Sequence, residues 1–431
     1  MRFYSTNNPS SHKATEDKNV PLVDFKTALF RGLADDGGLF MPEKFPKISI
    51  LPTDDFHKIA FKVAEKFIDI PAADLKKIIR NALNFPVPLV KLSERVSILE
   101  LFHGPTLSFK DFGARFMARV IDYYLGRSGE KLNIITATSG DTGGAVASGF
   151  HGLANVRVFI LYPSQRISPL QEKQITALGG NVIALEVDGD FDDCQRLAKQ
   201  ALADLELRHQ INLSSANSIN IGRLLPQTLF YFLTCQKMKE SVIVVPSGNF
   251  GNITAGLFAK KMGLKVGKFV AAVNKNSAVP DYLATGKINL QNKTKLTLSS
   301  AMDVGNPSNW ARILDLYGGN REAINKDLEA ISISEAETKK TIAETYKNHK
   351  YFLDPHTAVG VAAANKLLSR FNSSFVVLAT AHPAKFRDIV QSATGKKISL
   401  PKNLVKIVNK AKRSISLRAD YQYLKKIILT N

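Results

Sequence analysis

Lys110 is the residue of this chain whose type and surroundings most directly predict chemistry. It lies in the segment FHGPTLSFKDFG, residues 102–113, between Phe109 and Phe112 and close to Leu107. Burial among apolar side chains disfavours an ammonium, lowers the pKa of the lysine and makes its amine a better nucleophile toward an aldehyde. Because a lone lysine is far more often a surface residue, this hypothesis needs support from other motifs.

Two glycine-rich segments provide that support. ATSGDTGGA covers residues 137–145 and PSGNFGN covers residues 246–252, and each follows an apolar run and precedes a predicted helix. Glycine lets the backbone approach a ligand, and the start of a helix presents free N–H groups to an anion. The second segment lacks the GxxxxGK[ST] pattern, so we expect no nucleotide P-loop. A simple helix cap by Ser139 or Asp141 is the alternative for the first segment.

Alternating strands and helices must position these motifs. We expect strands at residues 133–137, 156–161, 182–185, 242–245, 270–273 and 375–379, and helices at 140–149, 168–178, 190–205 and from the second glycine segment to 261. This alternation predicts an α/β fold with buried parallel sheets. In such sheets ligands bind beyond the carboxyl ends of the strands, where the glycine segments fall.

The first 90 residues have a different pattern and are expected to form a unit of their own. The turn DDGG at residues 35–38 leads into an apolar run, and amphipathic helices are expected at about 54–68 and 72–84. Pro86 and Pro88 mark the boundary.

Bulk composition excludes several classes of protein. The 431 residues, 45% of them hydrophobic and 22% charged, suit a globular protein of two or three domains. We expect no membrane span and no signal peptide, since apolar runs are short and the N-terminus has no apolar stretch. Cys194 and Cys235 have neither metal-ligand spacing nor a disulfide framework, which predicts reduced thiols, no metal and a cytoplasmic location.

The net charge of +20 is concentrated toward the C-terminus. Residues 396–431 hold ten Lys or Arg against one acid, Asp420. Apolar residues at helical spacing predict an amphipathic helix with a basic, solvent-exposed face; these are Leu404, Ile407, Val408, Tyr421, Leu424, Ile427 and Ile428. Binding of a polyanion is the alternative, but no basic-aromatic recognition motif is present, so no nucleic acid partner is expected.

In their order along the chain, the three motifs closely resemble the threonine synthase family, a group of fold-type II (tryptophan-synthase β-like) enzymes that depend on pyridoxal 5'-phosphate (PLP). The resemblance covers nearly the whole chain and includes DGGLFMPE (36–43), SQRISPLQEKQ (164–174), SANSINIGRLLPQ (215–227), AMDVGNPSNW (301–310), DPHTAV (354–359) and ATAHPAKF (379–386). It implies an α/β fold of two lobes, each with a parallel sheet, and an added N-terminal domain. The implied boundaries are 1–90 for that domain and 91–431 for the catalytic region, with a smaller mobile lobe at about 130–230.

The resemblance also implies an activity. Such an enzyme is a carbon–oxygen lyase that acts on phosphates. It converts O-phospho-L-homoserine and water into L-threonine and phosphate by γ-elimination and β-hydration, the last step of threonine biosynthesis. The only expected partner is this small-molecule substrate, and the expected assembly is a monomer or weak homodimer.

Position by position, the resemblance assigns a role to each motif. Lys110 would carry the cofactor as a Schiff base and move protons, and Thr380 would hydrogen-bond the pyridine nitrogen, leaving it largely unprotonated. The remaining cofactor contacts would come from Gly248, Asn249, Phe250, Gly251, Asn252 and Asp141. The substrate's amino-acid end would lie at Ser139, Gly140, Asp141 and Thr142, and its phosphate at Asn217, Ser218, Arg223 and Arg166. Asn252 departs from the Asp expected in many relatives, which leaves the detail of cofactor binding open.

Two other functions compete with this one. Another fold-type II lyase, such as a serine/threonine dehydratase, shares the cofactor and the glycine loop but needs no second phosphate pocket. A non-catalytic polyanion-binding protein would use the basic C-terminal segment instead.

Overall fold

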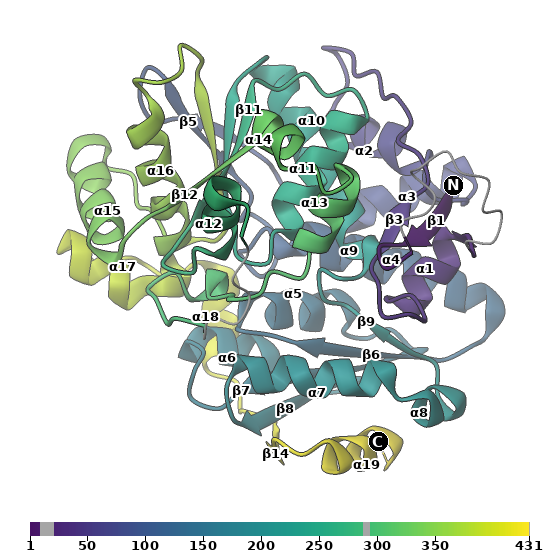
Figure 1. Ribbon diagram of the computed structural model, residues 1–431. Helices are drawn as coiled ribbons and strands as arrows, with labels where there is room; N and C mark the ends of the chain where they lie inside the picture. Colours follow the sequence, from purple (N-terminus) through teal and green to yellow (C-terminus); the bar gives the residue numbers. More distant parts are fainter. Residues whose placement is uncertain (9–20, 288–293, 431) are drawn as a thin grey trace.

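The computed structural model describes residues 1–8, 21–287 and 294–430, and contains three sheets (Figure 1). Residues 9–20 of the expected N-terminal unit and residue 431 of the expected C-terminal helix lie outside the described residues. The strands expected from the sequence are all confirmed, with small differences at their ends, as β6 (Leu132–Ala137), β7 (Val156–Pro163), β8 (Val182–Asp188), β10 (Val242–Pro246), β11 (Lys268–Val273) and β13 (Phe375–Ala379).

The largest sheet, which defines what we call the large lobe, has six strands. Their order is β12 (Leu328–Ser332), β11 (Lys268–Val273), β10 (Val242–Pro246), β13 (Phe375–Ala379), β5 (Val96–Glu100) and β4 (Leu89–Lys91). All neighbours are parallel except β4, which runs antiparallel to β5. Alternate residues of the central strands enter two different hydrophobic cores, one with α10 (Thr228–Lys237) and α11 (Gly251–Lys261), the other with α15 (Glu335–His349) and α16 (Pro355–Leu367). Helices therefore cover both faces, as continuous apolar strands require.

The second parallel sheet defines the small lobe. Its order is β14 (Ile415–Arg418), β8 (Val182–Asp188), β7 (Val156–Pro163), β6 (Leu132–Ala137) and β9 (Leu213–Ser215). One face packs on α5 (Asp141–Phe150) and α6 (Pro169–Thr176), and the other on α7 (Phe191–Ala203) and α19 (Tyr421–Thr430). The carboxyl ends of both parallel sheets can therefore contribute to one site between the lobes.

The N-terminal region adds a small antiparallel sheet of β2 (Val23–Asp24), β1 (Arg2–Ser5) and β3 (Phe40–Pro42). Its helices are α1 (Phe25–Arg31), α2 (Phe56–Ala64) and α3 (Ala72–Ala82). Asp24 and Asp55 cap α1 and α2 by accepting from backbone amides. Apolar residues of these helices share one core with α10 and with α4 (Lys110–Ser128), so the region packs directly against the helix that begins at Lys110.

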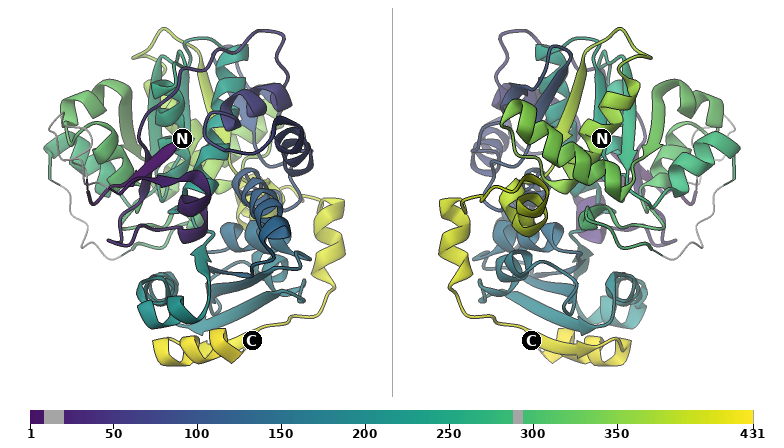
Figure 2. Two further views of the ribbon diagram at one scale, coloured as in Figure 1. Left: turned by 90° about the vertical axis from the view of Figure 1, so that its right-hand side faces the viewer. Right: turned by 90° about the vertical axis from the view of Figure 1, so that its left-hand side faces the viewer.

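The C-terminal segment is amphipathic helix at both sets of apolar residues, as expected, but an unexpected strand separates the two helices. It forms α18 (Lys402–Val408), then β14, then α19, and Val408 is exposed. The short edge strand buries only Leu417, so it gave no periodic signal in the sequence. Figure 2 shows this segment, in yellow, running along the outside of the molecule from the large lobe to the far side of the small lobe.

Part of the C-terminal positive charge is used for this docking rather than left in solvent. Lys412 Nζ lies 2.7 Å from carboxylate oxygens of both Glu172 and Glu186. Lys425 Nζ lies 3.0 Å from Asp204 and also contacts Glu206. Both lysines therefore pair with acids of the small lobe; Lys412 remains exposed, whereas Lys425 is partly buried, and the expected exposed basic face is wrong for Lys425 alone of the two.

The remaining helices connect these parts: α8 (Leu205–Gln210), α9 (Ile221–Leu224), α12 (Ala278–Thr285), α13 (Trp310–Leu316), α14 (Arg321–Asp327) and α17 (Arg387–Thr394), with short 3-10 turns at Leu225–Gln227, Ser300–Met302 and Pro383–Phe386. The helix expected at 190–205 ends at Ala203. Among the described helices, none combines the length and the apolar character needed to cross a membrane.

Candidate functional site

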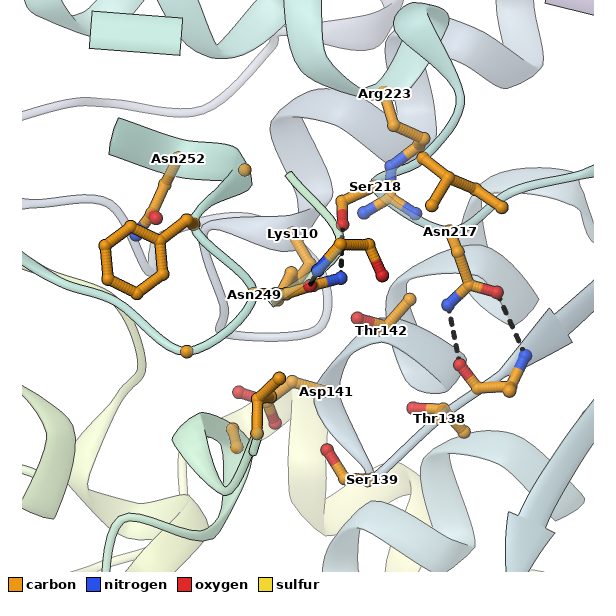
Figure 3. Close-up of a pocket in the computed structure, with 18 of the residues that line it drawn as sticks. Lys110, Thr138, Ser139, Asp141, Thr142, Asn217, Ser218, Arg223, Asn249 and Asn252 are labelled. Atoms are coloured by element: carbon orange, nitrogen blue, oxygen red, sulfur yellow. Dashed lines mark hydrogen bonds between the residues drawn. The ribbon is translucent and has the colours of Figure 1, made fainter. Parts of the chain in front are cut away.

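A pocket lies between the two lobes and brings most of the expected site residues together (Figure 3). Its walls include Lys110, Ser139, Asp141, Thr142, Asn217, Ser218, Arg223, Gly248, Asn249, Phe250, Gly251, Asn252 and Thr380. Gly140 is buried beside them. Arg166 is exposed after β7 and does not line this pocket.

Lys110 is held in place by the backbone on both of its sides. It is the first residue of α4, and the chain before it is bridged, through Ser108 and Ala381, to the segment that follows β13. Phe109 N donates to Thr380 O at 2.9 Å, and His382 N donates to Leu107 O at 3.0 Å. These bonds fix Lys110 and Thr380 at the same edge of the large sheet.

The surroundings of Lys110 favour its neutral amine. Burial lowers its pKa to about 8, the positive charges of Arg223 and Lys385 act in the same direction, and Asp141 opposes them. Its Nζ lies 4.6 Å from the centroid of the Phe109 ring, a contact that attracts the ammonium and so acts against the larger effect of burial. The amine is therefore available near neutral pH as a nucleophile or base, as expected from its aromatic neighbours.

The glycine-rich turn between β10 and α11 presents backbone amides to the pocket. No side chain caps the start of α11, and Phe250 adopts a left-handed conformation with φ of 58°. A Cβ at Gly248 would lie 2.6 Å from Met302 Cα, so close packing against a neighbouring loop requires glycine there. The uncapped helix start is suited to an anion such as a phosphate.

Asn252 uses its side chain to hold this turn together. Its Nδ2 donates to Pro246 O at 2.8 Å, and its Oδ1 accepts from Ile253 N at 3.0 Å and from Ser247 Oγ at 3.3 Å. Because Oδ1 and one of the two Nδ2 hydrogens are engaged within the turn, Asn252 has its backbone N–H and the second Nδ2 hydrogen left for an anion. The donor to Pro246 O also gives a reason for Asn rather than Asp at this position.

The SGDT segment is capped by a residue that sequence analysis missed. Thr138 Oγ1 accepts from Gly140 N at 2.9 Å and from Gly143 N at 2.8 Å. The alternative in which Ser139 or Asp141 caps the helix is therefore wrong, since no such cap is formed. Ser139 and Thr142 instead line the pocket with hydroxyl groups.

Asp141 forms a buried ion pair with Lys385, another residue that the sequence did not single out. Lys385 Nζ lies 2.7 Å from Asp141 Oδ1, and both side chains are almost completely buried. Burial alone would raise the pKa of Asp141, but the Lys385 ammonium and the Gln171 amide lower it overall. Asp141 is therefore a carboxylate whose charge is already balanced.

Asn217 and Ser218 have different roles from one another. Asn217 Nδ2 donates to Ala137 O at 2.6 Å and its Oδ1 accepts from Ala137 N at 3.0 Å, as the dashed lines in Figure 3 show. Asn217 thus ties its loop to the end of β6 and keeps one Nδ2 hydrogen for a ligand. Ser218 Oγ accepts from Asn249 and Asn309, both at 3.0 Å, so its own hydroxyl proton remains available.

Two buried guanidinium groups carry positive charge on this side of the molecule: Arg223 lines the pocket, and Arg312 lies behind it, bonded to Ser218 O and Asn309. Arg223 donates to Ala216 O, and its Nε has no partner in the described structure. Arg312 donates to three backbone oxygens and to Asn309 Oδ1. Burial lowers the pKa of Arg223 to about 10 and that of Arg312 to about 9. Neither forms an ion pair with a carboxylate among the described residues, so an anion can balance their charge.

His356 also lines the pocket and supports a loop of its wall. Its Nε2 accepts from Ala301 N at 3.1 Å, and its Nδ1 lies 2.7 Å from Asp354 Oδ1. These contacts require the proton on Nδ1 and hold Ala301 against the glycine turn. Within the described part of the chain, no group of three or more His, Cys, Asp or Glu side chains could hold a metal ion.

Comparison with known proteins gives consistent matches over nearly the whole chain. Residues 83–381 match the family model described as pyridoxal-phosphate dependent enzyme, residues 11–83 match threonine synthase N terminus, and residues 357–428 match threonine synthase, C-terminal. The threonine synthase of Escherichia coli (strain K12) is 42% identical over 421 residues, which cover 95% of this chain and 97% of the relative.

Two solved structures agree with these matches. The crystal structure of threonine synthase from Escherichia coli has a TM-score of 0.91 at 41% identity and covers 100% of both chains. The PLP-bound threonine synthase from Brucella melitensis has a TM-score of 0.90 at 35% identity and covers 99% of this chain and 98% of that one.

Proposed function

Because the chain belongs to the threonine synthase family of PLP-dependent lyases, we propose that it converts O-phospho-L-homoserine and water into L-threonine and phosphate. One observation supports this substrate above others. The pocket places the buried amine of Lys110 near the guanidinium of Arg223, which forms no ion pair with a carboxylate among the described residues, and near the uncapped start of α11. The positive groups of such a pocket can balance the negative charges of two phosphates, one on the cofactor and one on the substrate.

The residues present fit PLP. Lys110 supplies the amine that binds its aldehyde, the amides at the start of α11 suit its phosphate, and the Thr380 hydroxyl faces the same pocket. When bound, the cofactor supplies an electron-withdrawing ring that stabilises negative charge on the substrate. We assign the phosphate cradle to the backbone at 250–252 rather than to the Asn252 side chain.

Arg223 and Ser218 are our candidates for the substrate phosphate. A guanidinium can donate two parallel hydrogen bonds to phosphate oxygens, and the Ser218 hydroxyl can add a third. Asn217 acts by tying the loop of Ser218 to β6. Ser139 and Thr142, which come from the small lobe, would hold the amino-acid end of the substrate.

Lys110 is our candidate for the group that moves protons. A pKa near the working pH gives a general base both the neutral form and sufficient basicity. Phe109, which contacts the amine, and Phe250, elsewhere in the pocket lining, limit the water that reaches the reacting atoms.

The experiment compares wild type with Lys110→Ala. Wild type should release phosphate from O-phosphohomoserine and form threonine, and its visible absorbance should disappear on reduction with borohydride. Lys110→Ala should lack both the absorbance and the turnover. Formation of 2-oxobutyrate from threonine without phosphate release would instead support the dehydratase alternative.

Polyanion binding, cellular location and assembly are separate questions. We propose that the basic C-terminal segment serves docking, since Lys412 and Lys425 pair with acids of the same chain. A nucleic-acid shift that persists at physiological salt would contradict this. A cytoplasmic location agrees with the two free, buried cysteines. The assembly as a monomer or weak homodimer stays a prediction, which light scattering would check.

A further inference from the structure

The buried ion pair behind the pocket joins the two lobes. Lys385 lies in the 3-10 turn Pro383–Phe386, which follows Thr380 in the large lobe, whereas Asp141 is the first residue of α5 in the small lobe. The side chain of Lys385 is 0% exposed and that of Asp141 is 5% exposed. A charge buried this deeply persists only when it is paired, so each residue requires the other.

Further hydrogen bonds extend this pair into a network. Lys385 Nζ also donates to Thr106 O at 3.0 Å, and the same oxygen accepts from Gln174 Nε2 at 3.0 Å. Gln171 Nε2 donates to Asp141 Oδ1 at 2.9 Å. Gln171 and Gln174 belong to α6 of the small lobe, and Thr106 lies four residues before Lys110. The Lys385 ammonium thus contacts both the start of α5 and the segment that leads to Lys110. It is linked indirectly to α6, because Gln171 and Gln174 donate to the same two acceptors.

We propose that Lys385 is a positioning residue that acts through Asp141: it fixes the start of α5, and with it Ser139 and Thr142, against the segment that carries Lys110. This inference rests on the proposed function only for the choice of substrate in the assay. The hydroxyl groups of the small lobe come close to Lys110 only when the lobes are correctly placed. Lys385 makes the ionic contact that sets this placement, from behind the pocket wall rather than by touching the substrate.

The pair also balances the charge around Lys110. The charged groups that act on Lys110 are Arg223, Asp141 and Lys385. Around Lys385 itself lie Asp141, Asp111 and His382. Removal of the Lys385 ammonium would leave Asp141 as an unbalanced negative charge near Lys110, and would therefore favour the protonated form of Lys110.

The test compares four variants of the full-length holoenzyme with wild type. In Lys385→Met we expect kcat to fall about 100-fold, the effect of displacing a positioned group by about 1 Å. We also expect the acidic limb of the pH profile of kcat, which reports groups of the enzyme–substrate complex, to move to higher pH, and the urea midpoint of unfolding to fall. Lys385→Arg keeps the charge and should retain the pH profile of wild type.

The double variant Lys385→Met with Asp141→Asn separates positioning from charge burial. It removes both charges, so its urea midpoint should recover most of the loss while kcat stays low. The matched control is Lys366→Met, which removes a surface ammonium that contacts Glu337 with 44% of the lysine side chain exposed. This control should keep the kinetics of wild type.

Two results would overturn the proposal. The first is Lys385→Met with kcat and pH profile of wild type, whatever its stability. The second is a double variant no more stable than Lys385→Met, because the two residues would then not be coupled. If wild type fails to turn over O-phosphohomoserine, the proposed function fails, and the urea comparison still decides the coupling between Lys385 and Asp141.

Discussion

Replacement of Gly113 by alanine tests how closely α4 must pack against the segment that carries Arg223. A Cβ on Gly113 would lie 2.5 Å from the backbone oxygen of Arg223 and 3.0 Å from its Nε. Real Cβ atoms essentially never come within 3.0 Å of another heavy atom, and here the nearest atom belongs to the backbone. Either α4 or the chain at Arg223 must therefore move in Gly113→Ala.

The magnitude follows from two opposing effects. Alanine in place of glycine inside a helix stabilises by roughly 0.5–1 kcal/mol. Overpacking of a well-packed core costs about 1–3 kcal/mol. Gly126→Ala is the matched control, since Gly126 is exposed on the same helix and its Cβ would meet nothing within 4 Å. Gly126→Ala has the stabilisation by alanine without the overpacking. The free energies of unfolding of the two variants should therefore differ by the overpacking cost alone, about 1–3 kcal/mol.

Urea unfolding of the holoenzyme measures this difference, and turnover measures its consequence for the site. We expect Gly113→Ala to unfold at lower urea than Gly126→Ala. Because the displaced group is our candidate for binding the substrate phosphate, kcat/KM should also fall in Gly113→Ala and stay unchanged in the control. Equal urea midpoints and equal turnover for the two variants would refute the reasoning.

Three further predictions concern single groups. In protein stripped of its cofactor, the neutral amine of Lys110 is the reactive form, so labelling by an amine reagent should rise with pH through about 8; a midpoint near the ordinary lysine value of about 10.4 would contradict the burial argument. Asn252→Asp replaces the donor to Pro246 O with an acceptor, so urea unfolding should show a loss of about 1–3 kcal/mol, and an unchanged midpoint would mean that this bond contributes nothing. Burial raises the pKa of the Cys194 and Cys235 thiols, so a thiol reagent should label them only after unfolding, and fast labelling of the native protein would show that the sites open.

The sequence predicted the parts of the site that depend on strand ends. Lys110, the SGDT segment and the glycine turn each follow or precede a parallel strand, and the carboxyl ends of such strands meet at one edge. Apolar runs buried on both faces have a clear pattern, which is why β10 and β13 were placed correctly. β14 has one buried residue and no such pattern.

Residues that act through three-dimensional pairing could not be found in this way. Lys385, Arg312 and Thr138 look like ordinary residues in the sequence, and their roles come from partners far along the chain or from the turn geometry. Asn217 is an example of an amide that the fold already engages in part, since its Oδ1 and one of its Nδ2 hydrogens bond the backbone at Ala137. A sequence lists donors and acceptors, but only the fold shows which ones are already engaged.

β14 is an edge strand of the small lobe and lies near the end of the chain, so this lobe is incomplete until translation is almost finished. This strand pairs with β8, yet roughly 230 residues separate the two along the chain. At ribosomal speeds, β8 is made on the order of 10–50 s before its neighbour. During that time the edge of β8 presents unpaired backbone groups, the kind of surface that recruits other chains. We therefore expect the nascent protein to depend on chaperones until its last residues emerge, and chains truncated before residue 415 to aggregate even though every residue of the pocket is present.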